Sequence, residues 1–563
     1  MRRWVRVAAI ALAALLLAWV GFNLVMDPSG AFGDRILGDY GYNMTRFPHM
    51  AKMAWLETRP HKYGGFVVGS PAAGLDVGTL AEYTGLDFYD LTFEDGPGSA
   101  AAAARYALET HGARHIVLAM GPQGTAYGPR HSALGGGVAD YVRCLFMNPL
   151  RGVDKLRAQN GYFPARVDAI NPETGGYDRR ALDAAPVGDL TAYMQANPTF
   201  GTVVPQPPDA ASWTAAAAEI SALCGQYGAE LTIVVPPLWG YHGEPSLVDN
   251  MPPQATVWDF SGAALRGDWR FFYDAGHART ALGDRMLAQA FGGADDPLLG
   301  SGEAALAEEV RVPILLYHHI DAVGNGGAIC AESTLRGHME ALVAAGYTAV
   351  GFDDLIAFVA AGAELPERPV VITFDDGYAS NYEIAYPMLR ELGLKGTIFA
   401  IGVSVGKDTY KNSGTPIIPH FGLDEMAEMA ASGVMAVHSH TFDMHQSEAL
   451  DVVDYRRGVL PREGEREGDY IAAFRADFLR SKELIEAGTG HVADVFAYPH
   501  GQSAPLSEAL LREMGVRVSL TIAPHSNVLV RGLPQSLLQL GRYDMTDGVS
   551  SERMLDILAR DFE

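Results

Sequence analysis

The sequence "VITFDDGYAS" (residues 371–380) decides the fold of the C-terminal half of the chain. It begins with β-branched and aromatic residues, which favour a buried strand, and two adjacent carboxylates follow, Asp375 and Asp376. Neighbouring side chains on a strand point to opposite faces, so both carboxylates can serve one site only if the strand ends there. Gly377 permits the required turn. We therefore expect a strand that carries two carboxylates to a site at its carboxyl end.

Strands and helices alternate throughout the C-terminal half. Apolar runs predict strands at residues 312–319, 369–374, 396–402, 434–440 and 495–501. Apolar positions with helical spacing predict helices at residues 333–346, 423–433 and 470–487. Ser333 or Thr334 is the expected N-cap of the first helix, and Ser380 and Glu383 have the spacing of a capping box. Strict alternation predicts a parallel sheet or barrel, with the active residues at the carboxyl ends of its strands.

Histidines gather at these predicted strand ends. They are His318, His319, His438, His440, His445 and His500. One carboxylate with two neutral imidazoles commonly holds a divalent metal and leaves a position open for water. A second carboxylate beside that water can accept its proton. His438 lies two residues before His440 and is expected on the same strand face.

As a set, these motifs resemble the polysaccharide deacetylases, or NodB-homology carbohydrate esterases. The similarity is greatest to the poly-N-acetylglucosamine deacetylases of exopolysaccharide systems. It rests on "PILLYHHI", "VVITFDDGY", "SHTFDMH" and "FAYPHG", in the order of the family, over about residues 310–550. The resemblance implies a distorted (β/α) barrel and a metal-dependent hydrolase.

The resemblance also implies roles for individual residues. Asp376, His440 and His445 would hold the metal, most readily Zn²⁺, with Ni²⁺ or Co²⁺ as alternatives. Asp375 would be the general base and His318 the general acid. The expected substrate and oxyanion contacts are the Tyr378 N–H, Pro499 and His500.

This sequence departs from the family pattern in one important place. The family has an arginine two residues before the motif proline, where it steadies the base, and this chain has Ala497 there. Arg542, in "LGRYDMTD", is a candidate substitute. His438 is an alternative metal ligand to His440.

The N-terminal half resembles the SGNH (GDSL-like) hydrolases and related polysaccharide O-acetylation proteins over about residues 60–292. The similarity rests on "GGFVVGSPAAGLDV" and on Asp274 and His277 in D-x-x-H spacing. The family serine is third in its G-x-S turn, but Pro71 stands there and Ser70 is one residue out of register. We expect a non-catalytic SGNH-like α/β domain. An O-acetylesterase or acetyltransferase using Ser70, His277 and Asp274 is the alternative.

An apolar segment begins the chain. Arg2, Arg3 and Arg6 precede an apolar run from Val7 to Met26. As a helix, such a run covers about 30 Å, the thickness of a bilayer core. The following residues offer no A-x-A-like cleavage site, so we expect a single uncleaved transmembrane helix, with a cleaved signal as the alternative. Basic residues before the helix predict a cytoplasmic N-terminus and a periplasmic or extracellular body.

Composition bounds the remaining possibilities. The net charge is −25 and there is no basic stripe, which argues against a nucleic-acid partner. Cys144, Cys224 and Cys330 have no metal-like spacing, and either one disulfide between the first two or buried free thiols would fit.

The chain is predicted to divide into an anchor at 1–27, an SGNH-like domain at 28–295, a linker at 296–309 and a deacetylase domain at 310–563.

The predicted function is metal-dependent removal of N-acetyl groups from an N-acetylglucosamine-containing exopolysaccharide outside the cytoplasm. Exopolysaccharide biosynthesis or export machinery is the expected protein partner. The alternatives are a peptidoglycan or O-acetyl glycan deacetylase, the serine enzyme described above, and a non-catalytic glycan-binding export protein.

Overall fold

The structure is a computed structural model that divides into two compact units. It describes residues 2–36, 48–59, 61–93, 96–121, 138–159, 169–197, 209–237, 246–325, 327–411, 413–451, 455–504 and 506–562. The first unit comprises Met1–Leu182 and Met194–Ala307, and the second comprises Asp183–Tyr193 and Glu308–Glu563. Cys144, Cys224 and Cys330 are all free and buried, so the alternative of a disulfide is wrong.

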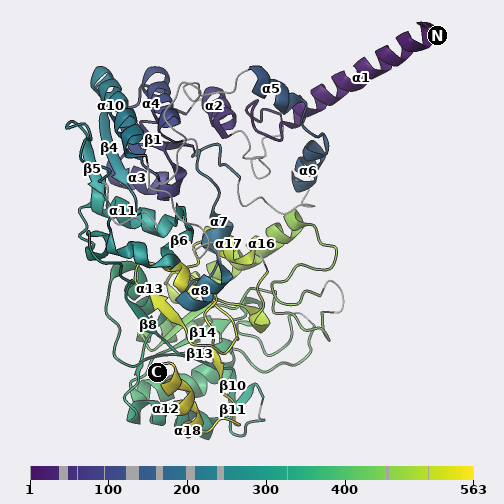
Figure 1. The fold of residues 1–563 in the computed structure, drawn as a ribbon. Coiled ribbons are helices and arrows are strands. Elements are labelled where there is room, and N and C mark those ends of the chain that lie inside the picture. Colours follow the sequence, from purple (N-terminus) through teal and green to yellow (C-terminus); the bar gives the residue numbers. More distant parts are fainter. Residues whose placement is uncertain are drawn as a thin grey trace. The chain divides into compact units, whose positions relative to one another are not determined.

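The first unit is built on a parallel sheet of five strands in the order β2-β1-β3-β4-β5 (Figure 1). The strands are β1 Gly65–Gly69, β2 Phe88–Thr92, β3 His115–Ala119, β4 Glu230–Val235 and β5 Thr256–Asp259. The main helices are α3 Val77–Thr84, α4 Pro97–His111, α10 Ala210–Tyr227 and α11 Thr280–Gly292. The strand order reverses between β1 and β3, and in such sheets a ligand crevice forms at the carboxyl ends of those strands. The SGNH-like assignment of this unit stays a prediction.

The other elements of this half are short, with one exception. They are α2 Pro48–Thr58, α5 Val138–Leu145, α6 Leu150–Gln159, α7 Arg180–Asp183, α8 Leu190–Ala196, β6 Phe272–Asp274 and β7 His277–Ala278. The exception is α1, Arg2–Met26. Among the described residues, Arg3–Met26 is the one helix long and apolar enough to cross a membrane.

The second unit is built on a parallel sheet in the order β17-β16-β15-β14-β13-β9-β19, with β12 also paired to β13. The strands are β9 Ile314–Tyr317, β12 Thr348–Ala349, β13 Pro369–Asp376, β14 Gly396–Ala400, β15 Met435–Ser439, β16 Val495–Ala497, β17 Val518–Leu520 and β19 Tyr543–Asp544. Leu540 bridges Leu520 in parallel, and β19 just beyond it pairs with β9. One segment therefore touches both outer strands and curls the sheet toward closure.

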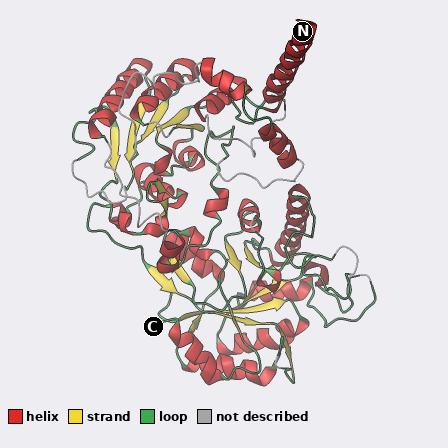
Figure 2. Cartoon of the chain, turned by 45° about the vertical axis from the view of Figure 1, so that its right-hand side comes forward, coloured by secondary structure: helices red, strands yellow, loops and turns green. Residues whose placement is uncertain are grey.

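Helices surround this sheet (Figure 2). They are α12 Glu332–Ala344, α13 Phe352–Ala361, α14 Tyr386–Leu392, α15 Leu423–Ser432, α16 Glu467–Thr489, α17 Ser507–Glu513 and α18 Ser551–Arg560. The short strands outside the main sheet are β8 Glu309–Arg311, β10 His319–Asp321, β11 Ile329–Ala331 and β18 Val528–Val530. The sequence predicted the α/β alternation of this unit but missed the strands β12, β17 and β19, which are two or three residues long, and the helices α13, α17 and α18.

The predicted helix caps are wrong. α12 begins at Glu332, and its N-cap, Ala331, makes no side-chain capping bond. Ser380 caps no backbone N–H of the following turn. Instead its hydroxyl accepts a bond from the Ile320 N–H (3.0 Å) and pairs with His319 Nδ1 (2.9 Å). A hydroxyl near a crowded strand end finds partners across the sheet that local spacing does not reveal.

A segment of the N-terminal half, Asp183–Tyr193, belongs to the second unit. Gln535 donates from Nε2 to Asp183 Oδ1 (3.2 Å), and the Val187 N–H donates to the Gln535 carbonyl (3.4 Å). A Cβ added at Gly188 would lie 2.5 Å from the Val528 carbonyl oxygen, so glycine is required for this close approach. The predicted boundary at residues 296–309 does not account for this segment, which precedes the linker but belongs to the second unit.

Glu508, near the start of α17, is a buried carboxyl whose pKa burial raises from 4.5 to about 7. Its Oε2 accepts a 2.8 Å hydrogen bond from the Ser519 hydroxyl. The folded state therefore holds this proton more tightly than the unfolded state does. As pH rises from about 4.5 to about 7 the unfolded chain ionises first, so the protein loses stability through this window and does not regain it above.

We predict that Glu508→Gln removes this loss. The amide is neutral at every pH, so the variant should gain about 1–3 kcal/mol of unfolding free energy at pH 8 and nothing near pH 4. Urea denaturation of the full chain across this range measures the difference. Glu463→Gln, at an exposed position, is the matched control and should show no pH-dependent gain. Equal stability curves for the Glu508 variant and the wild type would contradict the prediction.

Candidate active site

The candidate active site lies at the carboxyl end of the parallel sheet of the second unit. Asp375 and Asp376 end β13, His440 follows β15, and His318 follows β9. β13 pairs in parallel with β9 and β14, and β14 pairs with β15, so these strand ends share one edge. His445 reaches the same place from the loop after β15. The sheet thus gathers residues from distant parts of the sequence.

The two carboxylates reach one site because the backbone turns at Asp376. Asp376 adopts φ +74° and Gly377 adopts φ +84°. The left-handed region costs a non-glycine residue about 1–2 kcal/mol. With this turn both carboxylates face His440, whose Nε2 lies 3.8 Å from Asp375 Oδ2 and 3.7 Å from Asp376 Oδ1. β13 therefore ends at Asp376, as the sequence predicts if both carboxylates are to serve one site.

Asp376, His440 and His445 form a group that could hold a metal ion. One ligand atom from each lies within 4.8 Å of the other two. His445 Nε2 is 3.6 Å from Asp376 Oδ1, and that buried oxygen has no hydrogen-bond partner among the described residues. An unsatisfied buried carboxylate oxygen facing two imidazoles matches the donors that divalent transition metals prefer. The residues present therefore fit a metal.

The protonation of His440 suits a metal ligand. Burial lowers the pKa of His440 to about 4, so the ring is neutral near pH 7. Its Nδ1 donates a 2.8 Å hydrogen bond to the Ala497 carbonyl, which leaves the Nε2 lone pair directed to the site. The position where the family pattern has arginine thus supplies a backbone oxygen that orients the histidine.

Arg542 holds Asp375 through two hydrogen bonds. Nη1 donates to Asp375 Oδ1 at 2.6 Å and Nη2 donates to Oδ2 at 2.7 Å. Burial would raise the pKa of Asp375, but Arg542, His440 and His318 hold it below its ordinary value. Arg542 is itself fully buried, and its Nε donates to the Thr521 carbonyl at 2.9 Å. The structure thus places an arginine on Asp375 from a part of the chain other than the motif position.

His318 and Tyr378 border the two carboxylates. His318 is half-buried, and its charge contributes to lowering the pKa of both Asp375 and Asp376. Its carbonyl accepts a 2.9 Å bond from Asn381 Nδ2, which fixes the backbone at that point. Burial, followed by the charge of Asp376, raises the pKa of Tyr378. The ring of Tyr378 lies between those of His319 and His420, with centroids 5.2 and 4.9 Å away.

The turn Pro499–Gly501, from the "FAYPHG" motif, lies beside His445. Pro499 is buried, and His500 is exposed with φ +56°. The ring of His500 lies 4.5 Å from that of His445, between centroids. His500 is therefore placed to line the site.

His438 does not share the surroundings of His440. β15 ends at Ser439, the His440 N–H still donates to the Ala400 carbonyl of β14 (3.0 Å), and Thr441 then adopts φ +74°. Burial lowers the pKa of His438 to about 4, and its charged neighbours begin with Asp494 and Asp353. His438 is absent from the metal-binding group found among the described residues, and its expected place on the same strand face as His440 stays a prediction.

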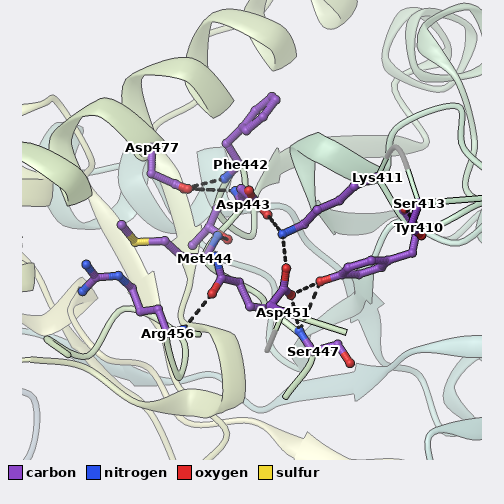
Figure 3. A network of polar contacts seen from close by, with 12 residues as sticks. Tyr410, Lys411, Ser413, Phe442, Asp443, Met444, Ser447, Asp451, Arg456 and Asp477 are labelled. Carbon is purple, nitrogen blue, oxygen red and sulfur yellow. Dashed lines mark hydrogen bonds and ion pairs between the residues drawn. The ribbon is translucent and has the colours of Figure 1, made fainter. Parts of the chain in front are cut away.

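A network of polar contacts holds the loop that carries His445 (Figure 3). Asp477, from α16, accepts 2.8 Å hydrogen bonds from the Phe442 and Asp443 N–H groups. Lys411 Nζ lies 2.7 Å from Asp443 Oδ1 and 2.6 Å from Asp451 Oδ1. These contacts fix the chain just before His445.

The same network fixes the chain after His445. Asp451 accepts a 2.9 Å hydrogen bond from the Ser447 N–H and another from the Tyr410 hydroxyl. The Arg456 N–H donates to Gln446 Oε1 at 2.7 Å. His445 is therefore clamped on both sides by residues that the sequence motifs do not include.

Sequence reasoning missed Asp477 and Lys411. Asp477 lies on the predicted helix 470–487 between Phe474 and Phe478, which are fully buried. A carboxylate amid the apolar positions of a helix was the available signal, since such a group needs buried donors. Lys411 carries no comparable signal, because its partners come from a different loop.

In the first unit, two of the three predicted serine-enzyme residues pair. His277 Nδ1 lies 2.9 Å from Asp274 Oδ1. Ser70 is buried, and its hydroxyl accepts a 3.2 Å bond from the Ala72 N–H as the cap of a short 3₁₀ turn. A Cβ at Gly121 would lie 2.3 Å from Ser70 Oγ, so this hydroxyl is tightly enclosed. The structure thus gives Ser70 a capping contact and gives His277 a carboxylate partner.

Comparison with known proteins identifies the C-terminal half. Residues 362–519 match the sequence model of the family described as polysaccharide deacetylase. YxkH of Bacillus subtilis (strain 168), named as a polysaccharide deacetylase, is 28% identical over 240 residues, which cover 43% of this chain and 73% of that protein. The poly-beta-1,6-N-acetyl-D-glucosamine N-deacetylase of Escherichia coli (strain K12) is 26% identical over 203 residues.

The chain spans only part of some of these relatives. The match covers 34% of this chain and 30% of the Escherichia coli protein. Among solved structures, IcaB from Ammonifex degensii aligns with a TM-score of 0.37 and 24% identity, over 45% of this chain and 98% of that one. The match of residues 362–519 to the family model shows that the C-terminal half of this chain carries a polysaccharide deacetylase domain, and the relatives named as N-deacetylases are hydrolases acting on amide bonds.

Proposed function

We propose that the chain is a metal-dependent N-deacetylase of an N-acetylglucosamine-containing polysaccharide, held by α1 at a membrane and working outside the cytoplasm. The observation that carries the proposal is the group of Asp376, His440 and His445 beside the Asp375–Arg542 pair. The relatives named as poly-beta-1,6-N-acetyl-D-glucosamine N-deacetylases support the substrate class. Exopolysaccharide biosynthesis or export machinery is the proposed partner.

A metal held by Asp376, His440 and His445 would polarise the acetamide carbonyl and lower the pKa of water. Zn²⁺ suits this donor set, as do Ni²⁺ and Co²⁺. The clamp around His445 and the bond from His440 to the Ala497 carbonyl would keep the two rings in place for it.

The other site residues have complementary tasks. Asp375 accepts the proton of the attacking water, and Arg542 keeps this carboxylate ionised and oriented. The Tyr378 N–H, which bonds no acceptor among the described residues, donates to the carbonyl oxygen as negative charge develops there. His318 gives its proton to the sugar nitrogen as the C–N bond breaks. The products are acetate and a free amine on the sugar.

The substrate alternatives share this chemistry. A peptidoglycan N-acetyl group or an O-acetyl group on another glycan would meet the same residues. Acetate and free amine, both measured on a panel of acetylated glycans, distinguish the two classes, since O-deacetylation releases no amine. The serine route is less well supported, because the Ser70 hydroxyl is buried and caps its own turn.

We predict that Asp376→Asn abolishes both metal retention and acetate release from N-acetylglucosamine oligomers by the full chain. The amide offers a weaker ligand than a carboxylate. A chelator should stop the wild-type enzyme, and Zn²⁺, Ni²⁺ or Co²⁺ should restore it. His491→Gln, at an exposed position, and Ser70→Ala should keep full activity. Release that survives in Asp376→Asn, or that disappears in Ser70→Ala, would favour the serine route instead.

We predict that Arg542→Lys lowers kcat by about 100-fold while bound metal is retained. Lysine preserves the positive charge but cannot hold both oxygens of Asp375 at once, so the base loses its orientation. Steady-state kinetics and metal analysis on the same preparation separate the two effects. Arg517→Lys is the matched control, because this half-exposed arginine also pairs with an aspartate, Asp494, but lies outside the site. An unchanged kcat in Arg542→Lys would show that the orientation of Asp375 does not depend on this pair.

We predict that Lys411→Met weakens metal retention by roughly 10-fold or more, with kcat nearly restored at saturating metal. The substitution frees Asp443 and Asp451, so the segment carrying His445 loses its clamp. Competition with a chromogenic chelator measures the affinity. Lys407→Met, four residues earlier and exposed, should leave the affinity unchanged. Equal affinities in the two variants would rule out a positioning role for Lys411.

A further inference from the structure

The C-terminal end of α1 is part of the folded first unit. Asn23 is fully buried, and its Nδ2 donates to the carbonyls of Leu145 (2.8 Å) and Met147 (2.7 Å) at the end of α5. Trp19 Nε1 donates to the same Met147 carbonyl at 2.7 Å. These bonds satisfy the carbonyls that a helix end leaves without intrahelical partners. Removal of α1 would leave them unpaired, so the contacts favour a helix that is kept over a signal that is cleaved.

Helix α6 fastens the segment that follows α1. A Cβ at Gly152 would lie 2.6 Å from the ring of Phe22 and 2.9 Å from Met26, so α6 approaches α1 closely. Lys155 Nζ lies 2.7 Å from Asp34 Oδ1 and donates to the Asp27 carbonyl at 3.1 Å. All three residues are buried. The base of α1 is therefore held by both apolar and ionic contacts.

Helix α5 lies beside this base (Figure 1) and carries an exposed apolar stripe. The stripe consists of Val138 (83% exposed), Tyr141 (37%), Val142 (44%) and Phe146 (47%). Spacings of three and four residues place them on one face of the helix. Asp140 and Arg143 form a surface ion pair off this stripe, and Cys144 faces the protein interior. α5 is thus amphipathic, with its apolar face outward.

The stripe is continuous with the apolar surface of α1. The rings of Phe146 and Trp19 meet edge to face, with centroids 6.5 Å apart. Only 11% of the most apolar window of α1 is buried. Tryptophan favours the interfaces of a bilayer, and Trp19 lies where α1 meets the folded first unit. If α1 spans the membrane, Trp19 and the stripe both lie at the level of the lipid head groups.

We propose that the α5 stripe lies in the interfacial layer of the same bilayer that α1 crosses, so that a transmembrane helix and a helix parallel to the surface form one anchor. Amphipathic helices bind lipid in this way, with the apolar face buried about 5–10 Å into the boundary of the head groups. The occupant of the stripe is therefore lipid. This inference rests on the proposed membrane anchoring and does not depend on deacetylase activity.

Nitroxide labels on the full chain in phosphatidylcholine–phosphatidylglycerol vesicles test the proposal. The labelled sites are Tyr141→Cys, Val142→Cys and, as the matched control, Tyr227→Cys. Tyr227 is 43% exposed and ends α10, which Figure 1 draws at the side of the first unit opposite α1. The three native cysteines are buried, so the wild-type chain serves as the labelling blank. Labels at 141 and 142 should collide preferentially with oxygen, and the label at 227 should collide with a water-soluble nickel chelate.

A label at Leu12→Cys, in the middle of α1, distinguishes the position of the stripe from the membrane anchoring on which that proposal rests. If this label is in lipid while those at 141 and 142 collide with nickel as freely as that at 227, the stripe proposal is wrong and the anchor stands. If Leu12→Cys is also in water, the anchoring itself fails. Dipolar broadening between labels at 142 would identify a second copy of the chain as the occupant, which also overturns the proposal. Acetate release by each variant, measured in parallel, reports on the catalytic proposal separately.

Discussion

The buried pair of Arg542 and Asp375 is the interaction on which both the active site and the end of the sheet depend. Two charges removed from water are expensive unless every donor and acceptor is satisfied, and loss of one partner costs about 3–5 kcal/mol. Here the guanidinium bonds both carboxylate oxygens and the Thr521 carbonyl. β13, the region after β17 and the last segment of the sheet therefore meet at one side chain. The geometry of Asp375 and the packing of the C-terminal strands cannot change independently.

The alternating elements of the second unit could be predicted because their signals are local. Each long strand is a continuous apolar run, and the Asp–Asp–Gly sequence marks where β13 turns. The contact between Arg542 and Asp375 spans 167 positions and has no local signal. Residue type made Arg542 a candidate, but only the pairing of β19 with β9 brings it to the carboxylate. The missed strands are too short for apolar periodicity to distinguish them from loop.

The histidines after β15 also show how far local sequence patterns can predict the site. Strand periodicity applies to β15 and the residue that follows it, but it gives no position for His445, which lies in the loop beyond. A left-handed residue at Thr441 sends the chain away from the sheet, and the loop is then positioned by Asp477, Lys411 and Asp451. The motif identifies which side chains could bind a metal. The positions of their nitrogens depend on a network contributed by other elements.

Because Asp183–Tyr193 belongs to the second unit, this segment can take its final place only late in synthesis. Asp183 is made 352 residues before Gln535, the residue whose side chain it bonds. At about 5–20 residues per second, roughly 20–70 s pass between the synthesis of the two partners. The first unit can complete its parallel sheet in this interval, but Asp183–Tyr193 cannot take its place in the second unit until Gln535 has been made. The N-terminal half is therefore synthesised with a segment whose binding partners have not yet been made. Neither half of the sequence alone contains all the residues of the unit that it mainly forms.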